Sequence, residues 1–249
     1  MKLDNIIGKT RSKIVYRDGD LAIKVFNEGY SKANVLREAL NHSLVEEIGL
    51  NVPKVVEVCK VDNKWAIVYD FIEGESLDKL MAKYPEKIDE YLELFVDLQM
   101  HIHTKKSPSL IKLKDKMKGK ISEANISESL RYDLHTRLEG MPKHTKVCHG
   151  DFNPTNIIIT PDGKAYVLDW AHVTQGNASA DVARSYLLFY LDGKAEIGEK
   201  YLDLFCKKTN TAKHYIQQWI PIVATSQSVK AYEDERELLL HWANVVDYE

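Results

Sequence analysis

The sequence has few cysteines, and their arrangement excludes two common roles. Only three cysteines, Cys59, Cys148 and Cys206, occur among the 249 residues. A small secreted domain held by disulfides contains an even, dense set of cysteines, and a zinc site usually shows closely spaced pairs. Neither pattern is present here, so we expect reduced thiols in a cytoplasmic protein.

Long apolar runs and an excess of positive charge are also missing. No stretch approaches the roughly 20 apolar residues that a membrane-spanning helix needs, and residues 1–5 contain no apolar signal core. The 34 Lys and Arg residues are outnumbered by 37 Asp and Glu, which leaves a net charge of -3. Broad binding to nucleic acid requires a surplus of positive charge. We therefore expect neither a membrane nor nucleic acid as a partner; the oligomeric state is open.

What is present is typical of a soluble globular protein. Hydrophobic residues make up 44% of the chain and charged residues 29%, which is ordinary for this class. The length indicates one large domain or two closely associated lobes.

The N-terminal part reads as short strands around one helix. Four β-rich runs are separated by turn residues: 12–17, 21–26, 55–61 and 65–72. Ile6 and Ile7 are read as the start of a further strand. Between the second and third runs, leucine and isoleucine recur at helical spacing, which predicts one helix after Ser31. These residues are Leu36, Leu40, Leu44 and Ile48.

From residue 73 onward the pattern becomes mainly helical. Helical periodicity covers residues 76–84, 85–104, 121–138 and most of the chain after Ala178. One β-rich interruption, residues 157–160 and 165–168 around Pro161-Asp162-Gly163, predicts a hairpin set among the helices. The fold class is therefore α+β.

The strongest chemical signal is a polar motif just before this hairpin. His149, Asp151 and Asn156 match His-x-Asp-x₄-Asn and precede the apolar strand that begins at Ile157. Phosphoryl transfer needs a carboxylate that orients the acceptor hydroxyl and accepts its proton, and an oxygen ligand for the metal that neutralises the phosphates. Asp169, at the end of the hairpin, offers a second carboxylate, and Mg²⁺ prefers such hard oxygen ligands. The alternative is a purely structural role, in which these residues cap turns and end a strand.

With this motif the chain resembles the aminoglycoside phosphotransferase and choline-kinase-like family, distant relatives of protein kinases, over essentially its whole length. The resemblance implies a protein-kinase-like bilobal fold, with residues 1–72 as a small β-rich nucleotide-binding lobe containing one main helix. Residues 73–249 would form the larger, mainly helical lobe for catalysis and acceptor binding. It also implies that Asp151 is the catalytic residue and that Asn156 and Asp169 bind Mg²⁺.

The same resemblance assigns nucleotide-binding roles in the N-terminal part. Lys24 lies inside an apolar strand, where it would hold the α- and β-phosphates of ATP or GTP, and Glu38 in the following helix would hold Lys24. The alternative is an exposed edge-strand lysine and a solvated glutamate. The loop over the phosphates would run from Gly8 to Lys13 and include Ser12. It is not a P-loop, because Leu3 stands where that motif requires glycine.

The run from Val68 to Gly74 resembles the kinase hinge, so the backbone at Asp70 and Ile72 would bind the purine edge. Tyr69 immediately precedes it. Either its phenol lines the back of the base pocket and permits GTP at a rate within about tenfold of ATP, a difference of ~1.4 kcal/mol, or it packs into the core of the lobe and ATP dominates.

Two further residues of the motif region are assigned supporting roles. His149 more often braces such a loop than performs chemistry. Asp181 matches a family aspartate that anchors the backbone of the catalytic loop, although Asn177 and Ala178 depart from the family pattern there.

The acceptor is expected to be a small hydroxylated molecule, and the C-terminal helices carry an acidic, partly aromatic set suited to a cationic one. Its members are Asp192, Glu196, Tyr232, Glu233, Asp234, Glu235 and Glu237. The competing interpretation is a solvated helix face. Trp219 and Trp242 are either part of a cation-binding cage or core residues.

The sequence thus indicates a Mg²⁺-dependent small-molecule kinase that uses ATP or GTP. The alternative is a nucleotide-binding pseudokinase or scaffold without turnover, which the intact Lys24, Asp151, Asn156 and Asp169 disfavour. A protein kinase is less favoured, because Gly150 replaces an arginine that many protein kinases use and no Ala-Pro-Glu segment follows Asp169.

Overall fold

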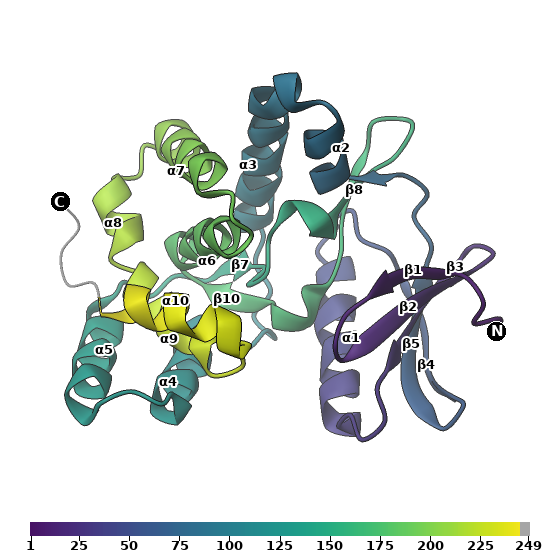
Figure 1. Cartoon of the computed structure of the whole chain (residues 1–249), viewed down its shortest axis with the longest axis horizontal. Helices are drawn as coiled ribbons and strands as arrows, with labels where there is room; N and C mark the ends of the chain where they lie inside the picture. Colours follow the sequence, from purple (N-terminus) through teal and green to yellow (C-terminus); the bar gives the residue numbers. More distant parts are fainter. Residues whose placement is uncertain (245–249) are drawn as a thin grey trace. The chain divides into compact units, whose positions relative to one another are not determined.

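The computed structural model describes residues 1–244, which divide into two compact units (Figure 1). Unit 1 comprises Met1–Pro85 and Pro154–His172, and unit 2 comprises Glu86–Asn153 and the described chain from Val173 onward. Each unit is described by itself. The predicted division into a nucleotide-binding lobe, residues 1–72, and a lobe for catalysis and acceptor binding, residues 73–249, stays a prediction.

Unit 1 is built on a five-stranded antiparallel sheet. Its strands are β1 (Ile6–Lys9), β2 (Lys13–Asp18), β3 (Leu21–Phe26), β4 (Val55–Val61) and β5 (Lys64–Asp70), in the order β1-β2-β3-β5-β4. The β2–β3 hairpin turns at Gly19, whose φ of 61° lies in the left-handed region that glycine adopts without strain. The strands predicted from β-rich runs are therefore present, with ends shifted by a few residues.

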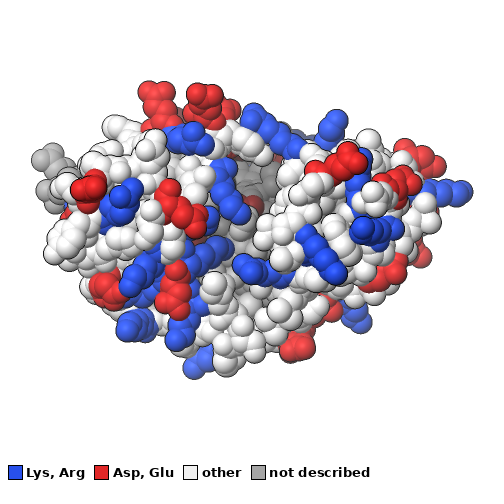
Figure 2. Space-filling model, turned by 90° about the horizontal axis from the view of Figure 1, so that it is seen from below, with Lys and Arg blue, Asp and Glu red and all other residues white. Residues whose placement is uncertain are grey.

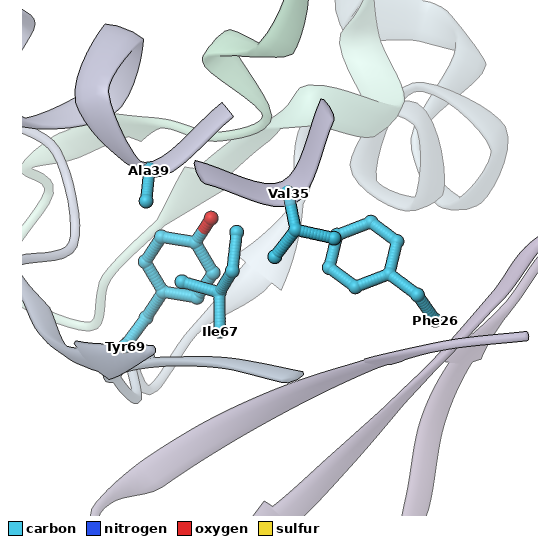
Figure 3. Packing of buried hydrophobic residues seen from close by; sticks show 5 residues of the cluster. All are labelled: Phe26, Val35, Ala39, Ile67 and Tyr69. Atoms are coloured by element: carbon cyan, nitrogen blue, oxygen red, sulfur yellow. The ribbon is translucent and has the colours of Figure 1, made fainter. Parts of the chain in front are cut away.

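One face of this sheet packs against α1 (Lys32–Glu46). Figure 3 shows Phe26, Ile67 and Tyr69 from the strands meeting Val35 and Ala39 from the helix, and all five are buried. The opposite face buries a second group, Ile23, Val25, Ala66 and Val68. Strands buried on both faces explain why β3 and β5 read as continuous apolar runs.

The leucines whose spacing predicted α1 do not form its buried face. Leu36 is 45% and Leu40 59% exposed. The buried face instead carries Val35, Ala39 and Val45 together with the polar residues Glu38, Asn41 and His42. The helix is oriented this way because its polar side chains find partners inside the unit, as His42 does at 2.5 Å from the carbonyl of Pro53.

The predicted hairpin of residues 157–168 belongs to a second, smaller sheet of unit 1. A small sheet has the order β6-β8-β9, from β6 (Glu75–Ser76), β8 (Ile157–Ile159) and β9 (Ala165–Val167). It is accompanied by α2 (Leu77–Lys83) and two short 3₁₀ helices, η2 (Pro154–Asn156) and η3 (Trp170–His172). Gly74 is required at its entrance, because a Cβ there would lie 2.4 Å from the carbonyl oxygen of Ile159.

Unit 2 is mainly helical. After η1 (Pro85–Lys87), its helices are α3 (Ile88–Thr104), α4 (Leu113–Glu123), α5 (Glu128–Gly140), α6 (Ala178–Leu191), α7 (Ala195–Thr209), α8 (Lys213–Gln217), α9 (Ile220–Ser228) and α10 (Glu233–Ala243). The strands β7 (Lys146–Cys148) and β10 (Thr174–Gly176) form an antiparallel pair. Aromatic rings of Phe95, Phe152, Phe189 and Tyr201 pack together in the core.

The α+β prediction is confirmed, with one error of segmentation. The single helix predicted over residues 121–138 is two helices, and the first of them begins at Leu113. The break occurs before Ser127, whose hydroxyl accepts a hydrogen bond from the Leu130 N–H at 3.2 Å and so caps α5. Between residues 1 and 244, no helix combines the length and the apolar character needed to cross a bilayer.

Candidate active site

A cluster of four charged side chains lies in unit 1. The ammonium nitrogen of Lys24, on β3, is 2.5 Å from Glu38 Oε1 on α1 and 3.1 Å from Asp169 Oδ1, which follows β9. Lys13, on β2, contributes its Nζ at 2.7 Å from Asp169 Oδ2. The consecutive elements β2, β3 and α1 and the distant segment that follows β9 therefore bring two carboxylates and two ammonium groups together.

Burial makes this cluster electrostatically strong. Lys24 and Glu38 are only 7% and 6% exposed, so their charges are weakly screened by water. Burial alone lowers the pKa of Lys24, but the charges of Asp169 and Glu38 outweigh this effect and the pKa lies well above its usual value. Burial also raises the pKa of Asp169, yet Lys24 and Lys13 bring it well below its usual range. Both groups are therefore charged at neutral pH.

The backbone at Asp169 is unusual. Its φ of 57° places a non-glycine residue in the left-handed region, which costs roughly 1–3 kcal/mol and occurs often at functional sites. The surrounding bonds hold this conformation: the Leu168 N–H donates to the Asn156 carbonyl at 2.8 Å, and the Trp170 indole donates to the Val167 carbonyl at 2.9 Å. The hairpin thus fixes both predicted metal ligands in one segment.

The residues present fit a magnesium site. Both oxygens of Asp169 attract cationic groups, and Asn156 supplies an amide oxygen, so the donor set is hard. Between residues 1 and 244, no group of three or more His, Cys, Asp or Glu side chains is arranged to hold a metal ion, so the candidate ligands here are Asp169 and the amide of Asn156. A metal here would complete its coordination with phosphate oxygens and water, as Mg²⁺ does.

The other predicted nucleotide-binding residues lie outside this charged cluster. Gly8 pairs with Val15 in the β1–β2 ladder, and Ser12 lies in the connecting turn, where its carbonyl accepts from the Asn27 N–H at 2.9 Å. Asp70 ends β5, and its N–H donates to the Lys54 carbonyl at 3.0 Å. Because the Asp70 N–H already donates to Lys54, the predicted contacts to the purine would have to come from the Asp70 carbonyl and from the backbone of Ile72.

Tyr69 lies in the core of unit 1. Its ring points from β5 toward α1 and packs against Ala39 and Ile67 (Figure 3). The side chain is 8% exposed, and burial raises the pKa of its phenol. This is the arrangement expected if Tyr69 is a core residue.

The loop that carries Asp151 lies in unit 2 and is held by a buried aspartate. Asp181, on α6, accepts hydrogen bonds from the backbone N–H groups of Gly150 at 2.7 Å and His149 at 3.2 Å, and His103 Nε2 lies 3.0 Å from it. Burial raises the pKa of Asp181, but these hydrogen bonds bring it below its usual value. The predicted anchoring role of Asp181 is confirmed.

Two more features shape the loop. His149 is fully buried, and its Nδ1 accepts the Asp151 N–H at 3.1 Å, which is the bracing contact that the sequence suggested. Gly150 adopts a φ of 80°, a conformation that strongly favours glycine. The loop therefore presents the Asp151 carboxylate on a rigid turn.

Sequence reasoning missed Arg184. Its guanidinium Nη2 lies 3.3 Å from Asp151 Oδ1. Arg184 follows Asp181 by one helical turn on α6, so one face of this helix supports both the backbone and the side chain of the loop. The position of Arg184 three residues after the recognised Asp181 was the sequence signal that could have identified it.

The residues predicted to receive a cationic acceptor do not form one cluster. Asp192 ends α6 and pairs with Lys194 at 2.5 Å, Glu196 lies in the first turn of α7, and the remaining five lie at the start of α10. Trp219 is fully buried, which makes it a core residue. Trp242 packs edge-on against Tyr190 and Tyr186.

The fold and sequence were compared with known proteins. The family model described as the phosphotransferase enzyme family matches residues 9–216. No protein among the curated ones matches the sequence.

Several solved structures share the fold. A thermostable mutant of aminoglycoside phosphotransferase APH(4)-Ia superposes with a TM-score of 0.73 at 11% identity, covering 96% of this chain and 92% of that one. Choline kinase LicA from Streptococcus pneumoniae gives 0.63 at 20% identity, covering 97% and 93%. ADP-bound aminoglycoside phosphotransferase APH(2'')-Ib gives 0.63 at 15% identity, covering 94% and 91%. At these identities the likeness establishes the fold, and the predicted protein-kinase-like class is confirmed.

Proposed function

We propose that this chain, which belongs to the phosphotransferase enzyme family, is a kinase that transfers the γ-phosphoryl group of a purine nucleoside triphosphate to a hydroxyl group of a small molecule. The observation that carries the proposal is the buried ion pair of Lys24 and Glu38 beside the half-buried Asp169. Such a lysine–glutamate pair beside a metal-binding aspartate is the arrangement that kinases use to hold phosphates. Structures with the same fold contain ADP, AMP-PNP or AMP.

Unit 1 would bind the nucleotide phosphates. Lys24, held by Glu38, would contact the α- and β-phosphates, and Asn156 and Asp169 would hold Mg²⁺. The metal supplies positive charge that neutralises the phosphates during transfer. Because Lys13 pairs with one oxygen of Asp169, metal binding at that oxygen requires Lys13 to move away, toward the phosphates or solvent.

Asp151 would act on the acceptor. Its carboxylate would orient the acceptor hydroxyl and accept its proton while the oxygen forms a bond to the γ-phosphorus. The bond between this phosphorus and the β-phosphate oxygen then breaks, which releases the nucleoside diphosphate. Arg184, the His149 ring and Asp181 position Asp151 for this role.

Of the two donors, ATP is favoured. The phenol of Tyr69 is packed between β5 and α1, which corresponds to the core alternative and leaves no reason for a shifted purine. A cytoplasmic location, expected from the cysteine pattern, remains part of the proposal.

A pseudokinase is the second candidate, and the intact charged cluster argues against it. The decisive experiment measures nucleotide consumption with MgATP and MgGTP over cationic, neutral and anionic hydroxylated acceptors, against an acceptor-free control. Acceptor-dependent turnover that Asp151→Asn abolishes supports the kinase. Tight nucleotide binding without turnover, whatever the acceptor, would support the pseudokinase.

A further inference from the structure

The surroundings of Asp151 within unit 2 are cationic. Four basic residues belong to this environment, which we call the cationic patch: Arg184 on α6, Lys116 and Lys120 on α4, and Lys230 just after α9. The helix α9 packs against both α4 and α6, so these residues converge from separate segments. On the face drawn in Figure 2, Lys and Arg side chains lie close together in places, with Asp and Glu side chains among them.

Arg184 has donors beyond those it uses. Its Nη2 bonds Asp151, whereas Nε and Nη1 are buried and lack a hydrogen-bond partner among the described residues. A guanidinium carries five N–H donors, and leaving buried donors unpaired costs free energy. They belong to the same guanidinium that contacts the carboxylate which would act on the acceptor, and this guanidinium would form charge-assisted hydrogen bonds with an anion that reached it.

Lys116 is the second unusual member. Burial lowers its pKa to about 8, with further lowering by Lys230, Lys120 and Arg184, while Asp151 acts in the opposite direction. Lys120 also pairs with Glu123 at 2.9 Å. Positive charges that repel one another in this way are unfavourable in the protein alone and are characteristic of sites that bind an anion.

Of the acidic residues predicted to bind the acceptor, one supplies an identified counter-charge here. Of that set, Glu235 is the one whose charge acts on Arg184, and the others are spread over α10 and the ends of α6 and α7. The cationic patch is therefore the feature that distinguishes the surroundings of Asp151.

We propose that the acceptor carries an anionic group, a carboxylate or a phosphate, which Arg184 and Lys116 bind while Asp151 acts on its hydroxyl. This inference rests on the proposed kinase function and names the class of its acceptor. It replaces the expectation of a cationic acceptor, because a cation beside these groups would be repelled.

The test uses matched acceptors that differ in charge. The full chain is assayed with MgATP and two series: glycerol, D-glycerate, sn-glycerol 3-phosphate and serinol, then D-glucose, D-gluconate, D-glucose 6-phosphate and D-glucosamine. Nucleoside diphosphate release and the phosphorylated product are both measured. We expect kcat/KM for an anionic member to exceed that of its neutral partner by at least about tenfold, or ~1.4 kcal/mol. The carboxylate and phosphate members show which anion is preferred.

Variants on α4 assign the effect to a residue. Lys116→Met is expected to raise KM for the preferred anionic acceptor about tenfold with a smaller effect on kcat, and Lys116→Arg to restore much of the affinity. Lys118→Met is the matched control, because Lys118 lies on the same helix with a side chain that is 65% exposed. It should behave as the wild type.

The outcomes separate the two proposals. Preference for the neutral or ammonium member, with turnover that requires Asp151, overturns the anionic acceptor and leaves the kinase function intact. If no acceptor reacts, D-glycerate and inorganic phosphate are titrated against the thermal unfolding of wild type, Lys116→Met and Lys118→Met. Anion stabilisation that Lys116→Met alone loses supports the anion site while the kinase function fails. Equal shifts in all three proteins overturn the site as well.

Discussion

Replacing Lys24 tests the charged cluster through stability, independently of any substrate. Lys24→Met removes a cation that lies 2.5 Å from Glu38 and is 7% exposed. Glu38, itself 6% exposed, then keeps a buried charge without its ion-pair partner. Losing one member of a buried pair typically costs about 3–5 kcal/mol. Asp169 retains Lys13 at 2.7 Å, so the loss falls mainly on Glu38.

The second member of the pair supplies the critical comparison. In Lys24→Met/Glu38→Leu both buried charges are gone, and such replacements by apolar residues are often neutral or stabilising. We therefore expect the double variant to recover most of the loss of the single one. Lys64→Met on β5 is the control, since an exposed lysine should change stability by about 0.5 kcal/mol or less.

The assay is urea unfolding at pH 7, followed by tryptophan fluorescence and circular dichroism so that separate unfolding of the two units is detected. A loss below about 1 kcal/mol in Lys24→Met would refute the argument that this pair is buried and strongly coupled. A double variant no more stable than the single one would show that the loss arises from packing and not from the unpaired charge.

Four further predictions follow from the site. Asp151→Asn should reduce kcat by at least about a hundredfold with little change in nucleotide affinity, because the amide cannot accept the hydroxyl proton; steady-state kinetics with unchanged turnover would remove this role. Asp169→Asn should raise the Mg²⁺ concentration for half-maximal activity more than about tenfold, because a charged ligand is lost; overlapping Mg²⁺ titrations would contradict it. Tyr69→Leu should destabilise the protein by roughly 1–3 kcal/mol and leave the ATP to GTP ratio of kcat/KM unchanged; a tenfold shift in that ratio would place the phenol at the base. Burial and the rest of the cationic patch lower the pKa of Lys116 to about 8, so Lys116 should lose its proton between pH 7 and 9. The KM for an anionic acceptor should therefore rise over this range in the wild type and change less in Lys116→Arg. Parallel pH profiles of KM for the two proteins would exclude Lys116 from the anion site.

Much of unit 1 could be predicted from the sequence because its signals are local. β-Branched runs and the Asp18-Gly19-Asp20 turn identify the β2–β3 hairpin without knowledge of the rest of the chain. The same holds for the motif around Asp151, whose spacing to Asn156 carries a chemical meaning by itself. For short strands such as β7 and β10, three residues each, the local signal is too weak, and pairing with a distant partner decides.

Orientation was less predictable than element type. Leucines at helical spacing predicted α1, but the helix turns its Leu36 and Leu40 outward because Glu38 pairs with Lys24 inside the unit. A periodic apolar pattern states which residues share a face, and not which face the rest of the fold covers.

The sequence by itself therefore determined the class of the protein, the phosphoryl-transfer residues Asp151, Asn156 and Asp169 as candidates, and the pairing of Lys24 with Glu38. Only the tertiary structure decided what surrounds them. Arg184 and Lys116 are 68 positions apart in the chain, and no local pattern connects them with Asp151. Their charges act on one another because α4, α6 and α9 pack together, and electrostatic energy depends on distance in space, whereas sequence motifs record only distance along the chain.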